Sequence, residues 1–293
     1  MAVSWCLVAL LATVVTAVAG EVDKQYGLIH TLPGESCRDI YQKNPTSHGK
    51  SGYYAIKVNN RPSFVYCDME LECGGEKGWM KVTGIDAAKT DCPQGWSKIT
   101  SPVAACRAPS DNAGCYSAQF STQRVPYSRV CGMVIGYQKG GTDGFANFLY
   151  SARSINGPYV DGVSITYGTP RIHIWTYGMG HTKKTSYLPE YPSNCPCSRY
   201  PGRLPPSFVR DDYYCEAGAL NGPTKGHQYV TSELVWDGKG CPDENSCCSF
   251  ANLPWFFKQI PLISDKNLEA RICRDESFSN EGVLVKEIKL YVQ

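Results

Sequence analysis

SCRDIYQKNPTSHGKSGYYAIKVNNRPSFVYCDMELECGGEKGWMKVTG, residues 36–84, is the stretch of sequence that decides how this chain of 293 residues begins to fold. Ser36 is a residue type that caps helices, Asp39 follows three positions later as in a capping box, and Pro45 cannot continue a helix. We therefore expect a short helix over residues 38–43, directly after the first cysteine of the stretch.

Two strands are expected after this helix. Tyr54, Ile56 and Val58 alternate with the residues between them, and a second alternating run covers residues 64–69. Residues 59–62 separate the two runs with the turn-forming sequence Asn-Asn-Arg-Pro. The local prediction is a helix, a β-hairpin and then a glycine-rich bend.

Six motifs occur in order along this stretch. They are a first cysteine, a D-I-Y helix, a G-Y-Y strand, a V-Y-C-D-M strand, a Gly-Gly pair and a tryptophan, at Cys37, Asp39–Tyr41, Gly52–Tyr54, Val65–Met69, Gly74–Gly75 and Trp79. In type and order they resemble the N-terminal subdomain of fibrinogen-related domains, and the resemblance covers about residues 36–84.

The resemblance implies several structural features of this stretch. It implies a disulfide between Cys37 and Cys67, and it implies that Trp79 packs in the core. Cys73 and the Glu76–Lys77 insertion depart from the family's G-G-G-W-T pattern, which indicates an additional bridge in this region. The likeness ends with the stretch itself, so the family's calcium and ligand pocket is not carried over to this chain.

The first twenty residues have the composition of a secretory signal peptide. An apolar stretch covers residues 5–18, and Ala17 and Ala19 form the small-residue pattern that signal peptidase accepts. We expect cleavage after Ala19 or Gly20. A short transmembrane anchor is the alternative, but the apolar stretch is below the ~20 residues that cross a bilayer. No later segment has eighteen consecutive apolar residues, so we expect a secreted, extracellular protein without a membrane span.

Cysteine usage agrees with that compartment. The chain has 15 cysteines, and removal of Cys6 with the signal peptide leaves fourteen, an even number. We expect these to form structural disulfides, because an oxidising compartment favours bridges over thiolate metal sites. Zinc coordination by the cysteines at 195 and 197 or at 247 and 248 is the alternative. The fourteen are Cys37, Cys67, Cys73, Cys92, Cys106, Cys115, Cys131, Cys195, Cys197, Cys215, Cys241, Cys247, Cys248 and Cys273.

Charge and motif content argue against several classes of function. The net charge is +2, with 29 basic and 27 acidic side chains, so no long-range field favours nucleic acid or an anionic membrane as partner. The chain contains no H-E-x-x-H helix, no G-x-S-x-G elbow, and no glycine-rich or Walker nucleotide loop. We therefore expect a protein that is not an enzyme and that has no cofactor; calcium also has no binding motif in the chain.

The five histidines are the remaining candidates for chemistry: His30, His48, His173, His181 and His227. His173 and His181 bracket an expected strand end. Asp143 or Asp161 would supply the carboxylate of a catalytic or zinc site there. We expect ordinary surface or strand histidines instead, because their spacing matches no catalytic or zinc motif.

Aromatic side chains are the candidates for ligand contact, since the chain has 19 tyrosines and 6 tryptophans. The aromatic runs at residues 175–177, 213–214 and 255–257 either pack in the core or meet a sugar ring or a partner's pocket. Core and sheet packing is the expected role. A ligand surface is expected, where one exists, near the loops at residues 139–148 and 177–181.

The remainder of the chain indicates β structure. Strands are expected at residues 130–137, 171–177, 229–236, 268–273 and 283–292. In the last strand, Glu287, Lys289 and Tyr291 share the face opposite to the apolar residues, which is typical of a half-buried antiparallel strand. Residues 187–206 hold six prolines, so this segment is predicted to be a stapled loop or a boundary.

The predicted organisation has four parts. These are a signal peptide (1–20), an N-terminal lead (21–35), a fibrinogen-like N-terminal subdomain (36–84) and a larger cysteine-rich β region (85–293). The expected fold class is α+β, predominantly antiparallel β and rich in disulfides.

Three further stretches carry a resemblance across the whole chain. They are GKGCPDENSCCSFANLPWFFKQIP, LEARICRDE and KLYVQ, at residues 238–261, 268–276 and 289–293. They are similar to uncharacterised secreted proteins of the skeletal organic matrix of stony corals. The likeness implies a biomineral extracellular matrix component that makes structural or adhesive contacts with matrix proteins or glycans. A lectin-like glycan-recognition module is the alternative, and a secreted enzyme with an unrecognised site is the third hypothesis.

Overall fold

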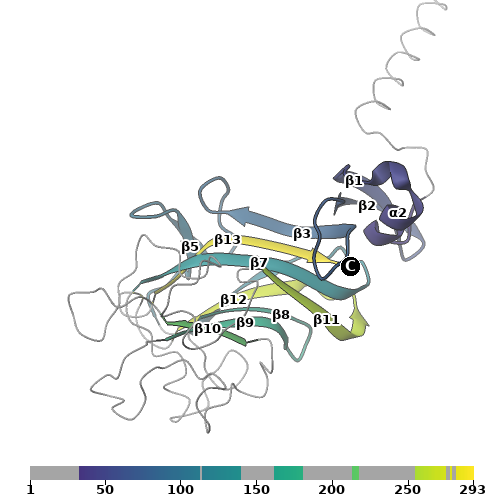
Figure 1. Ribbon diagram of the computed structural model, residues 1–293. Coiled ribbons are helices and arrows are strands. Elements are labelled where there is room, and N and C mark those ends of the chain that lie inside the picture. Colours follow the sequence, from purple (N-terminus) through teal and green to yellow (C-terminus); the bar gives the residue numbers. More distant parts are fainter. Residues whose placement is uncertain are drawn as a thin grey trace, which may run out of the picture. The chain divides into compact units, whose positions relative to one another are not determined.

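The computed structural model describes residues 33–112, 114–139, 162–180, 213–217, 255–274, 278 and 282–293. The chain divides into two compact units, the first ending at Met80 and the second beginning at Lys81. The boundary expected at residue 84 therefore lies just inside the second unit. Figure 1 shows the helices and strands and labels many of them.

The first unit opens with the expected helix, α2, which spans Cys37–Lys43 and is followed by the short 3-10 helix η1, Pro45–Ser47. Ser36 is the N-cap, and its Oγ accepts a 3.1 Å hydrogen bond from the backbone N–H of Asp39. The Asp39 carboxylate accepts from the N–H of Glu35, so the cap is a variant of the capping box. The helix begins one residue earlier than the sequence predicted.

The β-hairpin of the first unit consists of β1, Gly52–Val58, and β2, Arg61–Asp68. Asn59 and Asn60 connect them with φ angles of 50° and 61°, the left-handed conformation that two-residue hairpin turns require. The expected four-residue turn was therefore wrong, because the strand resumes at Arg61. Asparagine tolerates positive φ better than most residues, so this pair selects the tight turn.

A disulfide joins the helix to the hairpin, and a tryptophan indole is buried in the same unit. Cys37 at the start of α2 is bonded to Cys67 in β2, with the Cα atoms 5.5 Å apart, and this is the pairing that the resemblance implies. Trp79 is fully buried, and its Nε1 donates to the backbone carbonyl of Glu76 at 3.0 Å. Cys73 is also disulfide-bonded. The short helix is thus covalently fixed to the strands that follow it.

The first sheet of the second unit is arranged around one long strand. Its strands are β3 (Trp79–Asp86), β4 (Ser97–Ile99), β5 (Ala105–Arg107), β7 (Tyr127–Lys139), β11 (Trp255–Ser264) and β13 (Gly282–Val292). β13 pairs with β7 along its whole length and also lies next to β3 and β5. β11 extends the sheet beyond β7, and β4 extends it beyond β5.

The second sheet of this unit has the strand order β10-β9-β8-β12-β6. The strands are β6 (Gly114–Phe120), β8 (Gly162–Tyr167), β9 (Ile172–Gly180), β10 (Tyr213–Ala217) and β12 (Leu268–Arg274). All neighbours are antiparallel except β10, which runs parallel to β9. The described chain is therefore mostly antiparallel β, as the sequence predicted.

The two sheets of the second unit form two layers with an apolar core between them (Figure 1). Trp175 of β9 stacks on Phe256 of β11, with ring centroids 5.6 Å apart. Tyr127 of β7 meets Tyr167 of β8 edge to face, at 6.3 Å. These contacts join one sheet to the other, which is the arrangement of a β-sandwich.

Disulfides reinforce the second unit. Cys92 is bonded to Cys106 of β5, and Cys115 of β6 is bonded to Cys273 of β12. Cys131 is also disulfide-bonded. The expected disulfide-rich β fold is confirmed at this level. The cysteines at 195, 197, 241, 247 and 248 lie outside the described residues, and Cys215 is described only as backbone.

The sequence-based strands compare closely with the structure where it is described. Four of the five expected strands are present as β7, β9, β12 and β13. The fifth, at 229–236, and the proline-rich segment at 187–206 lie outside the described residues. Tyr291 was expected on the exposed face of the last strand, which was wrong, because its ring stacks against Trp255 and is only 5% exposed.

Gly78 provides a test of the packing in the first unit. Its φ angle is +80°, and a Cβ at this position would lie 2.8 Å from the carbonyl oxygen of Cys37 and 2.8 Å from the Cβ of Tyr41. We predict that Gly78→Ala lowers the free energy of unfolding by roughly 2–4 kcal/mol, because a clash with backbone adds to the cost of a positive φ. Urea-induced unfolding measures this change.

The matched control is Gly75→Ala. Gly75 has a similar φ angle of +76°, but no atom lies within 4 Å of the position that its Cβ would occupy. We expect a loss of only about 1 kcal/mol from the backbone conformation alone. Equal losses for the two variants would show that helix α2 does not pack on Gly78 in this way.

Candidate functional site

The second sheet of the second unit has one apolar and one polar face. Residues opposite each other in neighbouring strands share a face, and Trp175, which contacts the other sheet, lies opposite Ile165. Ser164 and Thr166 alternate with Ile165 in β8, so they and the residues that pair with them form the face turned away from the core, and these side chains are polar and buried. Ile174 is an additional residue of β9, so His173 pairs with Thr166. This polar face consists of Ser164, Thr166, His173, Thr176, Glu269 and Arg271.

Glu269 of β12 is the centre of the contacts on the polar face. Arg171 donates to both of its carboxylate oxygens, from Nε at 2.6 Å and from NH2 at 3.2 Å. Thr166 Oγ1 donates to the same carboxylate at 2.9 Å. Burial alone would raise the pKa of Glu269, but hydrogen bonds from Arg171, Ser117 and Thr166 outweigh it and lower the pKa below its ordinary value. Glu269 is therefore charged and held in place.

His173 of β9 is joined to a chain of hydroxyl groups. Ser164 Oγ donates to Thr176 Oγ1 at 3.0 Å, and Thr176 Oγ1 lies 2.7 Å from His173 Nδ1. Thr176 Oγ1 therefore bridges the serine hydroxyl and the imidazole ring. This arrangement fixes the orientation of the imidazole within the sheet.

The charge around His173 keeps the imidazole neutral. Burial, followed by the positive charges of Arg271 and Arg171, lowers the pKa of His173 from 6.5 to about 4, although Glu269 acts in the opposite direction. Burial and the charge of Arg171 also lower the pKa of Arg271. At neutral pH the polar face therefore holds one carboxylate, one guanidinium group and a neutral histidine, and the guanidinium of Arg171 binds the carboxylate.

This geometry favours a structural role over catalysis. A nucleophilic serine needs its base in direct contact, whereas Thr176 stands between Ser164 and His173. The carboxylate of Glu269 is bound by Arg171 and a threonine hydroxyl. The polar face links β8, β9 and β12 through buried side chains, and it fixes the register of these strands.

The other candidate residues from the sequence do not belong to the polar face. His48 of the first unit is exposed, and its ring stacks on Tyr41 at 4.1 Å. Within the described ranges, no group of three or more His, Cys, Asp and Glu side chains is arranged to hold a metal ion. No helix in the same ranges is long and apolar enough to cross a membrane. His30, His181, His227, Asp143 and Asp161 lie outside the described residues.

The aromatic runs that the sequence suggested mostly pack inside the second unit. Trp175 and Phe256 form the stack between the sheets, and Trp255 stacks on Tyr291 with ring centroids 6.5 Å apart. Phe257 is 40% exposed. Of the two loops expected near a ligand surface, only residue 139 and residues 177–180 are described, as backbone of β7 and β9. Core packing, the expected role, accounts for the described aromatic rings of β9 and for most of those of β11.

A different aromatic surface lies on the hairpin of the first unit, and the sequence analysis did not identify it. Tyr53 is 68% exposed and Phe64 is 66% exposed. Tyr66 lies opposite Tyr53, and the two rings meet edge to face at 5.5 Å. We call Tyr53, Phe64 and Tyr66 the aromatic face. In residues 52–58, buried side chains alternate with more exposed ones, and Tyr53 belongs to the more exposed set. This alternation was the signal of the aromatic face in the sequence.

Comparison of the chain with protein-family models, with curated proteins and with solved structures finds no match. The polar face and the aromatic face therefore have to be interpreted from their own geometry. The first is a buried network within one sheet. The second is an accessible surface, so it is the better candidate for contact with a ligand or partner.

The neutral state of His173 predicts a pH dependence of stability. Because its folded pKa is depressed, the unfolded chain binds an additional proton between about pH 4 and pH 6.5. Above the unfolded pKa of 6.5, the neutral His173 does not reduce the free energy of unfolding. As pH falls from 6.5 to about 4, protonation of the unfolded chain progressively lowers that free energy. We predict that the loss of unfolding free energy from pH 7 to pH 5 is about 2 kcal/mol smaller in His173→Asn than in the natural chain.

Urea titrations at the two pH values measure this difference. Asparagine places its amide where Nδ1 contacts Thr176, so the variant retains that hydrogen bond while it removes the titrating ring. The control is His48→Asn, which alters an exposed histidine of the first unit. An unchanged pH dependence in His173→Asn would mean that His173 is not held neutral in the folded protein.

Proposed function

We propose that this chain is a secreted component of the extracellular matrix, which acts through adhesive contacts. The observation that carries the proposal is the aromatic face, where Tyr53 and Phe64 leave about two thirds of their surface accessible. Exposed aromatic side chains that lie together are typical of contact surfaces, because they supply large apolar area and polar edges at once.

The rigidity of the hairpin supports this role. The Cys37–Cys67 disulfide fixes β2 to the helix, and the two-residue turn fixes β2 to β1. Tyr54, which neighbours the aromatic face in sequence, is buried and donates to the carbonyl of Lys50 at 2.6 Å. A surface ordered before binding loses little conformational entropy when it meets a partner.

Secretion and family likeness are part of the same proposal. Disulfides at eight of the described cysteines suit an oxidising, extracellular compartment. We further propose that residues 36–84 form a fibrinogen-like N-terminal subdomain. The Cys37–Cys67 pairing and the full burial of Trp79 support that assignment, because the resemblance requires both features.

A lectin-like module is the second candidate, and one observation favours it. The rings of Tyr53 and Phe64 are accessible on the outward side of a regular hairpin, which suits stacking against the apolar side of a sugar ring. In this case the partner of the aromatic face is a glycan. In the first case it is a matrix protein.

We predict that the aromatic face determines retention on insoluble matrix. Purified protein with intact disulfides is incubated with the acid-insoluble organic fraction of a stony-coral skeleton, and the bound fraction is measured. Tyr53→Ser combined with Phe64→Ser is expected to weaken retention by roughly tenfold or more, since anchor aromatics dominate binding energy. Both side chains are exposed, so the variant should fold normally.

The matched control is Leu262→Ser combined with Ile263→Ser, which removes two exposed apolar side chains from the second unit. It should be retained like the natural chain. A glycan array with and without calcium then separates the two candidates: binding that depends on the aromatic face supports the lectin-like role, and silence with matrix retention supports adhesion to protein. Equal retention of the aromatic-face variant and the natural chain contradicts the proposed contact surface.

A further inference from the structure

Strand β11 contains an irregularity that places apolar side chains in solvent. Gln259 pairs with Arg129 of β7, and Ser264 pairs with Tyr127, so four residues of β11 lie opposite one residue of β7. The additional residues are accommodated by a bulge of the strand at the edge of the sheet. We call Pro261–Ile263 the aliphatic bulge.

The side chains of the aliphatic bulge are far more exposed than apolar residues usually are. Leu262 is 77% exposed and Ile263 is 75% exposed, whereas the preceding Ile260 is buried at 4%. Leucine and isoleucine are among the residues most often found inside proteins. Two such side chains, adjacent and both exposed, form an apolar surface of the kind that marks an interaction site.

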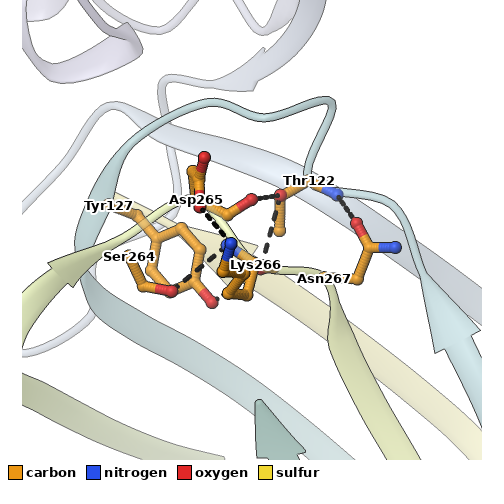
Figure 2. Close-up of polar contacts among 6 residues, drawn as sticks. All are labelled: Thr122, Tyr127, Ser264, Asp265, Lys266 and Asn267. Atoms are coloured by element: carbon orange, nitrogen blue, oxygen red, sulfur yellow. Dashed lines mark hydrogen bonds and ion pairs between the residues drawn. The ribbon is translucent and has the colours of Figure 1, made fainter. Parts of the chain in front are cut away.

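The base of the aliphatic bulge is held by hydrogen bonds, as Figure 2 shows. Thr122 Oγ1, in the loop between β6 and β7, lies 3.1 Å from the carbonyl of Asp265 and 3.4 Å from that of Lys266, and both carbonyls accept from it. The hydroxyl of Tyr127 donates to the carbonyl of Lys266 at 2.8 Å. Burial raises the pKa of Tyr127 to about 12, so this hydroxyl keeps its proton. The bulge is thus presented from a fixed base.

The charged side chains around the aliphatic bulge are mostly positive. The bulge-bearing segment, 258–267, and the loop tied to it, 121–126, contain three cations and one carboxylate: Arg124, Lys258, Lys266 and Asp265. Arg124 is exposed. The Lys266 side chain is 68% exposed, and its Nζ lies 3.4 Å from the carboxylate of Asp265, which is itself 51% exposed. The net charge of the whole chain is only +2, so this local excess is not a property of the surface in general.

We propose that the aliphatic bulge docks on an anionic lipid surface, with Leu262 and Ile263 entering the apolar layer and Arg124 and Lys266 meeting the headgroups. Apolar side chains that project from a fixed base, with cations beside them, combine the two terms that bind peripheral proteins to membranes. The site lies on the second unit, whereas the aromatic face belongs to the first. It would allow a matrix component to contact a cell membrane directly.

A protein partner fits these observations less well. Binding energy at protein interfaces is concentrated in tryptophan, tyrosine and arginine anchors, with leucine under-represented. The aliphatic bulge has no aromatic side chain, and it projects from an edge strand. Burial of aliphatic area in a hydrocarbon layer requires no matching pocket, so shape complementarity is not needed.

The test is co-sedimentation of the full-length secreted protein, disulfides intact, with vesicles of phosphatidylserine and phosphatidylcholine in equal parts. We expect binding to these vesicles and weaker binding to phosphatidylcholine alone. Leu262→Ser combined with Ile263→Ser should lower the partition coefficient by roughly tenfold or more, since each side chain loses its transfer into hydrocarbon. Arg124→Gln combined with Lys266→Gln should lower it several-fold on the anionic vesicles, and added salt should have a similar effect.

The control for this experiment is Tyr53→Ser combined with Phe64→Ser, which removes exposed apolar area elsewhere and should bind vesicles like the natural chain. The thermal unfolding midpoints of all variants are compared, because exposed substitutions should leave them unchanged. Absence of vesicle binding, or equal binding of the bulge variant and the natural chain, overturns the proposal. Loss of retention on protein matrix by the bulge variant, without vesicle binding, assigns the bulge to a protein partner and also overturns it.

Discussion

The disulfide between Cys115 and Cys273 is the constraint on which the second unit depends. It joins two residues that are 158 positions apart in the chain and that pair directly across β6 and β12. Two strands that are distant in sequence are therefore held side by side by a covalent bond. A link that closes so long a loop restricts the unfolded chain strongly. Because side chains alternate along β12, Cys273 lies on the same face as Glu269 and Arg271. The covalent bond therefore closes one end of the polar face.

Hydrogen bonds explain how the same sheet can bury charged residues on one side. A buried carboxylate or guanidinium destabilises the fold unless hydrogen bonds replace its contacts with water. Glu269 obtains these from Arg171 and Thr166, and His173 remains neutral among positive charges. The polar face thus specifies strand register, while the opposite face supplies the apolar core. The surfaces that we propose for contact lie on the hairpin of the first unit and on the aliphatic bulge of β11.

Local signals in the sequence predicted much of this fold, and non-local contacts account for what they missed. The cap at Ser36 and the alternation in β1 depend on neighbours in sequence, and both were correct. Strands β6 and β8 were among those missed. The residues of β8 alternate between apolar and polar types, but all of them are buried, so the alternation gave no sign that the polar side chains lie inside the protein. The polar face was missed for the same reason. The exposure of Leu262 follows from a register shift against β7, which no local pattern encodes.

The described cysteines form structural disulfides, which fix the strands that carry the surfaces we propose for contact. Peptide mapping of the purified protein by mass spectrometry, without reduction and with free thiols alkylated, tests this most directly. The structure predicts linked peptides for Cys37 with Cys67, Cys92 with Cys106, and Cys115 with Cys273. Alkylated thiols at these positions, or linkage of any of them to other cysteines, would contradict the account.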